Sequence, residues 1–107
     1  MLERMDEKFK PLNICKSRKA SPTYREIVFF NKDMKKWDRV LTGSLGEPVN
    51  SKWKNPEKNM EKMTRKYGGI RKGQTLYIKE FENFSIMAMI WPWKDKCHST
   101  LKLSVVH

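Results

Sequence analysis

The sequence has no long apolar segment. Its longest uninterrupted apolar run covers only residues 86–91, whereas a membrane-spanning helix needs about 20 apolar residues. Near the start of the chain, Glu3, Asp6 and Glu7 occupy positions where a secretory signal requires an apolar core. We therefore expect a cytoplasmic protein that neither spans a membrane nor carries a targeting segment.

Cysteine and histidine are scarce. Cys15 and Cys97 are the two cysteines, and His98 and His107 are the two histidines. We expect both thiols to be reduced, because disulfides are rare in the cytoplasm. The four side chains show none of the paired spacings of a zinc site, and no serine or carboxylate pair has a recognisable catalytic context. The sequence therefore predicts no metal, no cofactor and no evident catalytic group.

Acidic residues are outnumbered, and the imbalance is confined to one part of the chain. The 107 residues carry a formal net charge of +11, from 23 Lys and Arg against 12 Asp and Glu. Residues 10–72 hold 17 of the basic and six of the acidic residues, a net of +11, whereas residues 1–9 carry −1 and residues 73–107 carry +1. A field of this kind attracts polyanions. A nucleic acid or an acidic protein is therefore the expected class of partner.

In the first half of the chain, the pattern predicts a short helix and then a hairpin. Apolar residues at i, i+3 and i+7 predict a helix over residues 2–9, which a proline ends. Residues 12–22 are basic and irregular, and we interpret them as an arm. Aromatic and β-branched residues predict a strand over residues 24–30, with residues 37–42 as its hairpin partner.

The second half of the chain predicts one main helix and three strands. A proline start and a glycine stop bound a helix over residues 56–67. Period-two patterns then predict consecutive strands at 74–81, 84–91 and 99–106. The middle one of these three strands is apolar on both faces, as in a buried strand, and the last has one face suited to solvent.

These elements predict an α+β fold. Residues 1–22 would form the short helix and basic arm, and residues 23–107 a single small domain. In that domain, the hairpin, the main helix and the three-strand meander would close as an antiparallel sheet or a small barrel.

Lysines and tryptophans are interleaved in a way that suits single-stranded nucleic acid. Along the expected helix, Lys58, Lys62 and Lys66 recur at every fourth residue, so they share one flank that can neutralise phosphates or simply face solvent. Trp53 lies in a loop between two lysines, and Trp93 precedes another. Bases stack on such rings, whereas Trp37 and Trp91 are expected in the core. The predicted contacts are Lys52, Trp53, Lys54, Lys58, Lys62, Arg65, Lys66, Arg71, Lys72 and Trp93.

Three functions fit these observations. The leading hypothesis is a small basic protein that binds RNA or single-stranded DNA, alone or as a subunit of a ribonucleoprotein, by phosphate neutralisation and aromatic stacking. The alternative is a viral or mobile-element effector that docks its basic surface on an acidic host protein, with exposed Trp and Met as anchors. The third is a small toxin-like ribonuclease. Its candidate residues are Tyr67, Arg71, Lys72 and Tyr77.

Overall fold

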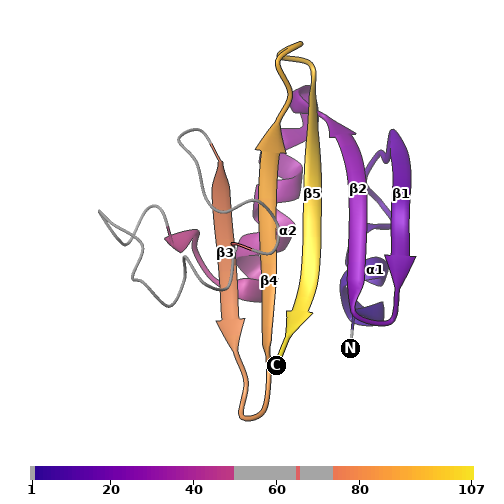
Figure 1. Cartoon of the computed structure of the whole chain (residues 1–107). Coiled ribbons are helices and arrows are strands. Elements are labelled where there is room, and N and C mark those ends of the chain that lie inside the picture. Colours follow the sequence, from indigo (N-terminus) through magenta and orange to yellow (C-terminus); the bar gives the residue numbers. More distant parts are fainter. Residues whose placement is uncertain (1, 50–64, 66–73) are drawn as a thin grey trace.

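A computed structural model describes residues 2–49, 65 and 74–107 of the chain (Figure 1). The described residues form an α+β domain in which helices α1 and α2 cover one face of a five-stranded antiparallel sheet. The elements in chain order are α1 (Glu3–Phe9), β1 (Lys16–Ser21), β2 (Tyr24–Phe30), a 3-10 turn (Asn31–Asp33), α2 (Met34–Leu45), β3 (Thr75–Glu80), β4 (Ser85–Pro92) and β5 (His98–Val106). The predicted α+β class is confirmed.

The sheet is open and not a barrel. Its strand order is β1-β2-β5-β4-β3, so β1 and β3 are the edges and the last strand of the chain lies in the middle. The predicted meander of β3, β4 and β5 is confirmed by antiparallel pairing of each with the next. The expectation of a solvent-facing side on β5 was wrong for Thr100 and Ser104, which are buried, whereas Lys102 between them is half-buried. A central strand has neighbours on both flanks, and they shield its polar positions.

Residues 37–42 were predicted as a strand, and this prediction was wrong. They lie within helix α2, where Trp37, Leu41 and Leu45 follow one another at intervals of four and are all buried. An interval of four places these side chains on one side of a helix. The Trp37 ring then packs against Phe9, at 5.0 Å between centroids, and Phe29, at 4.7 Å.

The interpretation of residues 12–22 as an irregular arm was wrong for the part that forms β1. Residues 16–21 pair with β2 in an antiparallel hairpin, with a register shift between Ser17 and Lys19. All six residues of β1 are exposed. The strand therefore lacks the alternation of buried and exposed positions that is typical of a half-buried strand. Hydrogen bonding to β2 therefore defines this strand, and burial contributes little.

The short N-terminal helix is confirmed as α1, and it is held to the sheet in two ways. Met5 and Phe9 are buried in the main core. On its other side Asp6 accepts hydrogen bonds from Arg25 of β2, from Nε to Oδ1 at 3.1 Å and from Nη2 to Oδ2 at 2.9 Å. Paired bonds of this kind fix orientation as well as distance. The predicted helix over residues 56–67 lies outside the described residues, except for Arg65. None of the helices in the described part of the chain is long and apolar enough to cross a bilayer.

Two glycines of the α2 region allow a matched test of the fold. Gly46 ends the helix at φ 86° and ψ 177°, a conformation that essentially only glycine adopts, so Gly46→Ala should cost about 1–2 kcal/mol of unfolding free energy. Gly43 lies inside the helix with open space where a Cβ would lie. Gly43→Ala should therefore raise the free energy of unfolding by about 0.8 kcal/mol. Urea unfolding followed by circular dichroism measures both changes. Equal effects of the two substitutions would contradict this assignment of the helix end.

Candidate nucleic-acid interface

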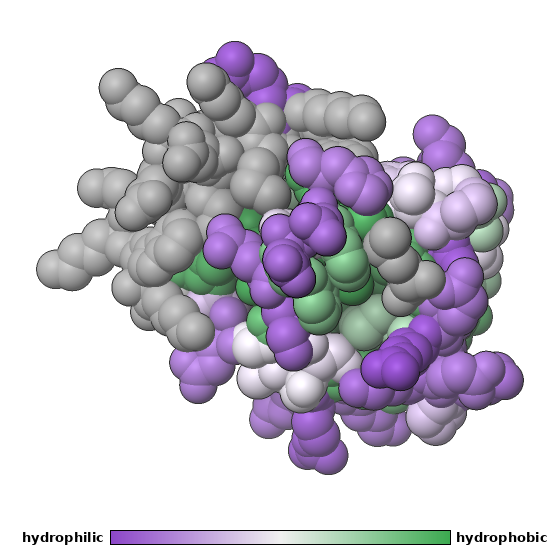
Figure 2. All heavy atoms as spheres, turned by 90° about the horizontal axis from the view of Figure 1, so that it is seen from below, coloured by the Kyte–Doolittle hydropathy of each residue, from purple (hydrophilic) through white to green (hydrophobic). Residues whose placement is uncertain are grey.

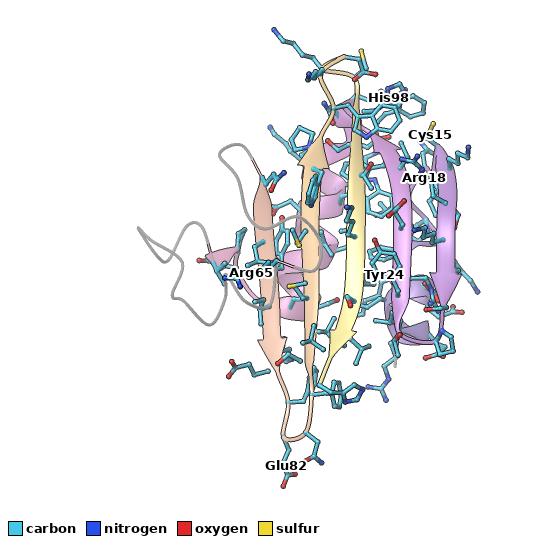
Figure 3. The ribbon with its side chains drawn as sticks, viewed as in Figure 1. Cys15, Arg18, Tyr24, Arg65, Glu82 and His98 are labelled. Carbon is cyan, nitrogen blue, oxygen red and sulfur yellow. The ribbon has the colours of Figure 1, made fainter. Side chains whose placement is uncertain are left out.

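The face of the sheet opposite the helices carries aromatic and basic side chains near the turn between β4 and β5. Thr100 of β5 lies opposite both Val28 of β2 and Trp91 of β4, and residues directly opposite in paired strands point to the same face. Trp93 lies two residues beyond Trp91 on that face. We call Phe30, Trp91, Trp93, His98 and Lys102 the tryptophan face. In Figure 3 His98 lies at the upper end of the sheet.

Three rings of the tryptophan face form a row across three neighbouring segments. The His98 ring lies 5.0 Å from that of Phe30 and 4.9 Å from that of Trp93, measured between centroids. Trp93 Nε1 donates a hydrogen bond to Thr100 Oγ1 at 2.8 Å, which fixes the orientation of the indole. Even so, Trp93 is 38% exposed. The protein therefore holds a large aromatic ring in a set orientation at its surface.

Cations adjoin these rings. Lys102 Nζ lies 4.0 Å from the centroid of the Trp91 ring, and Lys32 Nζ lies 5.6 Å from that of Phe30. Trp91 is half-buried beneath Lys102, and its Nε1 has no hydrogen-bond partner among the described residues. The contact between ammonium and ring holds the lysine along the surface of the sheet. Positive charge is thus placed directly beside aromatic rings of the sheet.

A shallow hollow of about 250 Å³ separates the tryptophans from strand β1. At its far side Arg18 Nε lies 3.7 Å from Glu26 Oε2, and the Tyr24 hydroxyl donates to Glu26 Oε1 at 2.9 Å. Glu26 is therefore held by two partners. The hollow is lined by Arg18, Glu26, Trp91, Pro92, Trp93, Thr100 and Lys102.

The turn beyond Trp93 is rigidly organised around one carboxylate. Asp95 Oδ1 accepts the backbone amides of Cys97 at 2.8 Å and His98 at 3.0 Å, and Oδ2 lies 2.5 Å from His98 Nδ1. The Cys97 amide and then the His98 side chain lower the pKa of Asp95, so the carboxylate stays charged at neutral pH. Its bonds hold His98, the middle ring of the aromatic row, in place.

Two of the predicted contacts can be located. Trp93 lies at one end of the aromatic row, beside His98, and Arg65 is exposed and helical. The remaining eight lie outside the described residues: Lys52, Trp53, Lys54, Lys58, Lys62, Lys66, Arg71 and Lys72. Sequence reasoning missed Lys102 and Arg18, which reach the tryptophan face and its hollow from two other strands. Their spacing along the chain carries no signal, since only strand pairing brings them together.

Tyr77, a candidate for ribonuclease chemistry, is placed in the core. It is buried, and its hydroxyl donates to Asp38 Oδ1 at 2.5 Å. Burial, followed by the bond to Asp38, raises the pKa of Tyr77 well above its usual range. The phenol therefore stays protonated at neutral pH and is unsuited to act as a base. No group of three or more metal-ligating side chains occurs among the described residues.

Both cysteines are free and exposed.

Comparison with known proteins adds nothing to this description, because no family model, no curated protein and no solved structure matches the chain.

Proposed function

We propose that this protein binds single-stranded nucleic acid, RNA or single-stranded DNA, on the tryptophan face. The observation that carries the proposal is the exposed indole of Trp93, which Thr100 holds in place and which lines the same hollow as Arg18 and Lys102. Single strands are bound in this way in general, because every base can stack on a ring while basic groups neutralise the backbone.

The position of the cations supports this function over docking on an acidic protein. Lys102 lies on the Trp91 ring itself, and Lys94 and Lys96 are exposed on the turn that follows Trp93. A nucleotide presents its base and its phosphate within one repeating unit, so stacking and charge groups need to be adjacent. A protein partner imposes no such spacing. Residues 50–73 hold eight Lys or Arg and two acids, and they add to the attraction.

The test of the proposal is a charge reversal in the tryptophan face compared with one elsewhere. Lys102→Glu should weaken binding of a labelled single strand by about tenfold, because it removes one phosphate partner and adds a like charge. Arg39→Glu on α2 changes the net charge equally but lies on an exposed part of the helix layer. It should change the affinity much less. Fluorescence anisotropy with single-stranded RNA, single-stranded DNA, duplex and heparin measures these affinities.

Salt dependence supplies the second readout. The logarithm of the association constant should fall linearly with the logarithm of salt concentration, and Lys102→Glu should make that slope shallower by about 0.7 for single strands. Equal losses for Lys102→Glu and Arg39→Glu would show that only total charge matters and would overturn the assignment of this face. Binding to an acidic protein with no measurable binding to nucleic acid would replace the proposal with the partner-protein alternative.

A further inference from the structure

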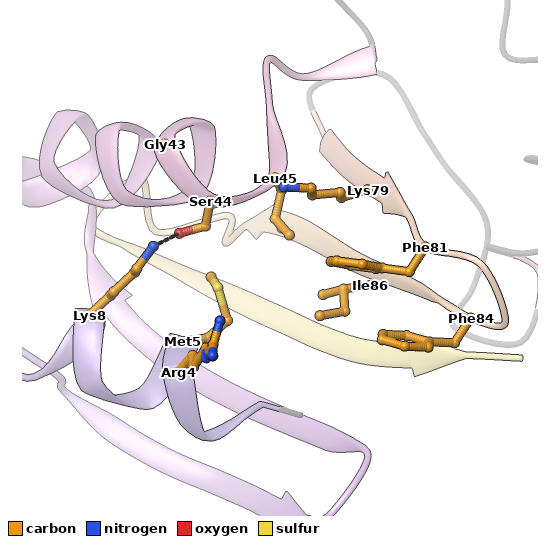
Figure 4. A pocket seen from close by; sticks show the side chains of 10 residues that line it. All are labelled: Arg4, Met5, Lys8, Gly43, Ser44, Leu45, Lys79, Phe81, Phe84 and Ile86. Carbon is orange, nitrogen blue, oxygen red and sulfur yellow. Dashed lines mark hydrogen bonds between the residues drawn. The ribbon is translucent and has the colours of Figure 1, made fainter.

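A second cleft lies at the other end of the sheet, between α1, α2 and the turn that joins β3 to β4. It has a volume of about 390 Å³ (Figure 4). Figure 2, which views the molecule from below, shows apolar side chains gathered here within a hydrophilic rim. The turn of residues 81–84 precedes β4 and that of residues 93–97 follows it, so the two turns lie at opposite ends of this strand (Figure 1). The cleft is therefore separate from the tryptophan face.

The charged side chains that line the cleft are all basic among the residues that the structure describes. Arg4, Lys8 and Lys79 are these three side chains, and all three are exposed. Lys8 Nζ donates to Ser44 Oγ at 3.0 Å. Among the described residues none of the three cations forms an ion pair. Three unpaired cations around one concavity favour an anion.

The remaining walls are apolar. Met5, Leu45 and Ile86 form buried sides. The rings of Phe81 and Phe84 stack on each other at 4.8 Å between centroids, with 15° between their planes, and Phe81 is 42% exposed. An aromatic ring at a hairpin turn leaves apolar surface exposed to water. An apolar ligand bound in the cleft would cover that surface.

We propose that this cleft binds a small amphipathic anion, with a single carboxylate or phosphate held by the three cations and an aliphatic body lying along Phe81 and Ile86. The side chains offer ammonium and guanidinium donors from α1 and β3, and Lys79 Nζ lies 5.5 Å from the centroid of the Phe81 ring, so charge and hydrocarbon are adjacent. The hydroxyl of Ser44 is the sole neutral polar side-chain group among the described residues of the lining, so a ligand with polar atoms spread over its length fits poorly. Pockets of this size bury most of a small ligand. A free fatty acid and an anionic membrane lipid both carry this chemistry.

The test uses the full-length protein with dodecanoate as the probe, followed by isothermal titration calorimetry below the concentration at which dodecanoate aggregates. We expect saturable binding of one dodecanoate per chain, with dodecanol, which lacks the charge, binding at least tenfold more weakly. Lys79→Glu should weaken dodecanoate binding by about tenfold. Lys94→Glu, an equal charge change on the opposite turn, should leave it within about twofold.

Two further measurements distinguish a free fatty acid from a membrane lipid as the ligand, and distinguish binding in this cleft from nucleic-acid binding. Phe81→Ala should weaken dodecanoate by about fivefold, since it removes apolar contact, and should leave RNA binding intact. Binding to vesicles that contain phosphatidylglycerol, lost in Lys79→Glu, would support the site and identify a membrane lipid as its source. Equal affinity for dodecanol and dodecanoate, or unchanged affinity in both Lys79→Glu and Phe81→Ala, would overturn the proposal.

Discussion

Trp37→Ala should lower the free energy of unfolding by about 3–5 kcal/mol. Trp37 has no exposed surface and lies between the rings of Phe9 and Phe29. It thereby joins α2 to α1 and to β2. Truncation leaves a cavity that these three elements can fill only by moving. A domain of this size has about 5–15 kcal/mol of stability in total, so much of it would be lost.

The test is urea unfolding monitored by far-ultraviolet circular dichroism. Trp37→Phe should cost far less than Trp37→Ala. It keeps a ring at this position, and it also removes the buried Nε1–H, which has no hydrogen-bond partner among the described residues. Ile14→Ala is the control for loss of an apolar side chain, because Ile14 is 45% exposed and its loss should cost less than about 0.5 kcal/mol. A loss below about 1 kcal/mol for Trp37→Ala would contradict the packing described above.

Strands that bury side chains on at least one face could be predicted from the sequence. A strand that is exposed on both faces could not be predicted in this way. β2, β3, β4 and β5 all carry alternating or continuous apolar residues, and each was expected within a few residues of its observed bounds. β1 is exposed at every position, so nothing in its composition distinguishes it from a loop. Its hydrogen bonds depend on a partner strand that residue patterns do not reveal.

Helix α2 was missed for a different reason. The segment Trp37-Asp38-Arg39-Val40-Leu41-Thr42 mixes aromatic and β-branched residues with polar ones, and Gly43 and Gly46 follow closely. Local preference therefore favoured a strand and a turn. Burial of Trp37, Leu41 and Leu45 along one side of the helix outweighs that preference, because tertiary packing contributes more than propensity.

The candidate site shows the same division between local and distant information. Trp93 was predicted from its neighbouring lysine in the sequence. Its closest structural partners, Thr100 and the His98 ring, come from the next strand, and Phe30 comes from a segment more than 60 residues earlier. Lys102 belongs to the side of the last strand that was expected to face solvent. Its contact with Trp91 follows from the pairing of β4 with β5, which spacing along the chain does not encode.

Trp93→Ala should weaken binding of single-stranded RNA by about 2 kcal/mol, or about 30-fold, while changing the affinity for duplex by less than about threefold. Bases in a single strand are free to stack on the indole, whereas bases in a duplex are already stacked on one another. Loss of the ring removes no charge, so the slope of affinity against salt should stay the same. This separates Trp93→Ala from Lys102→Glu, which changes the slope.

Phe81→Ala is the matched control for Trp93→Ala, since Phe81 is similarly exposed but lies on the turn between β3 and β4. Anisotropy titrations of both variants against the same RNA, at two salt concentrations, compare a ring inside the tryptophan face with one outside it. Equal weakening by the two variants would mean that any exposed ring contributes and that the tryptophan face is not the binding surface. Selective weakening by Trp93→Ala, with RNA and single-stranded DNA affected alike, would show that the face stacks bases without reading the sugar, because the 2′-hydroxyl then plays no part in recognition.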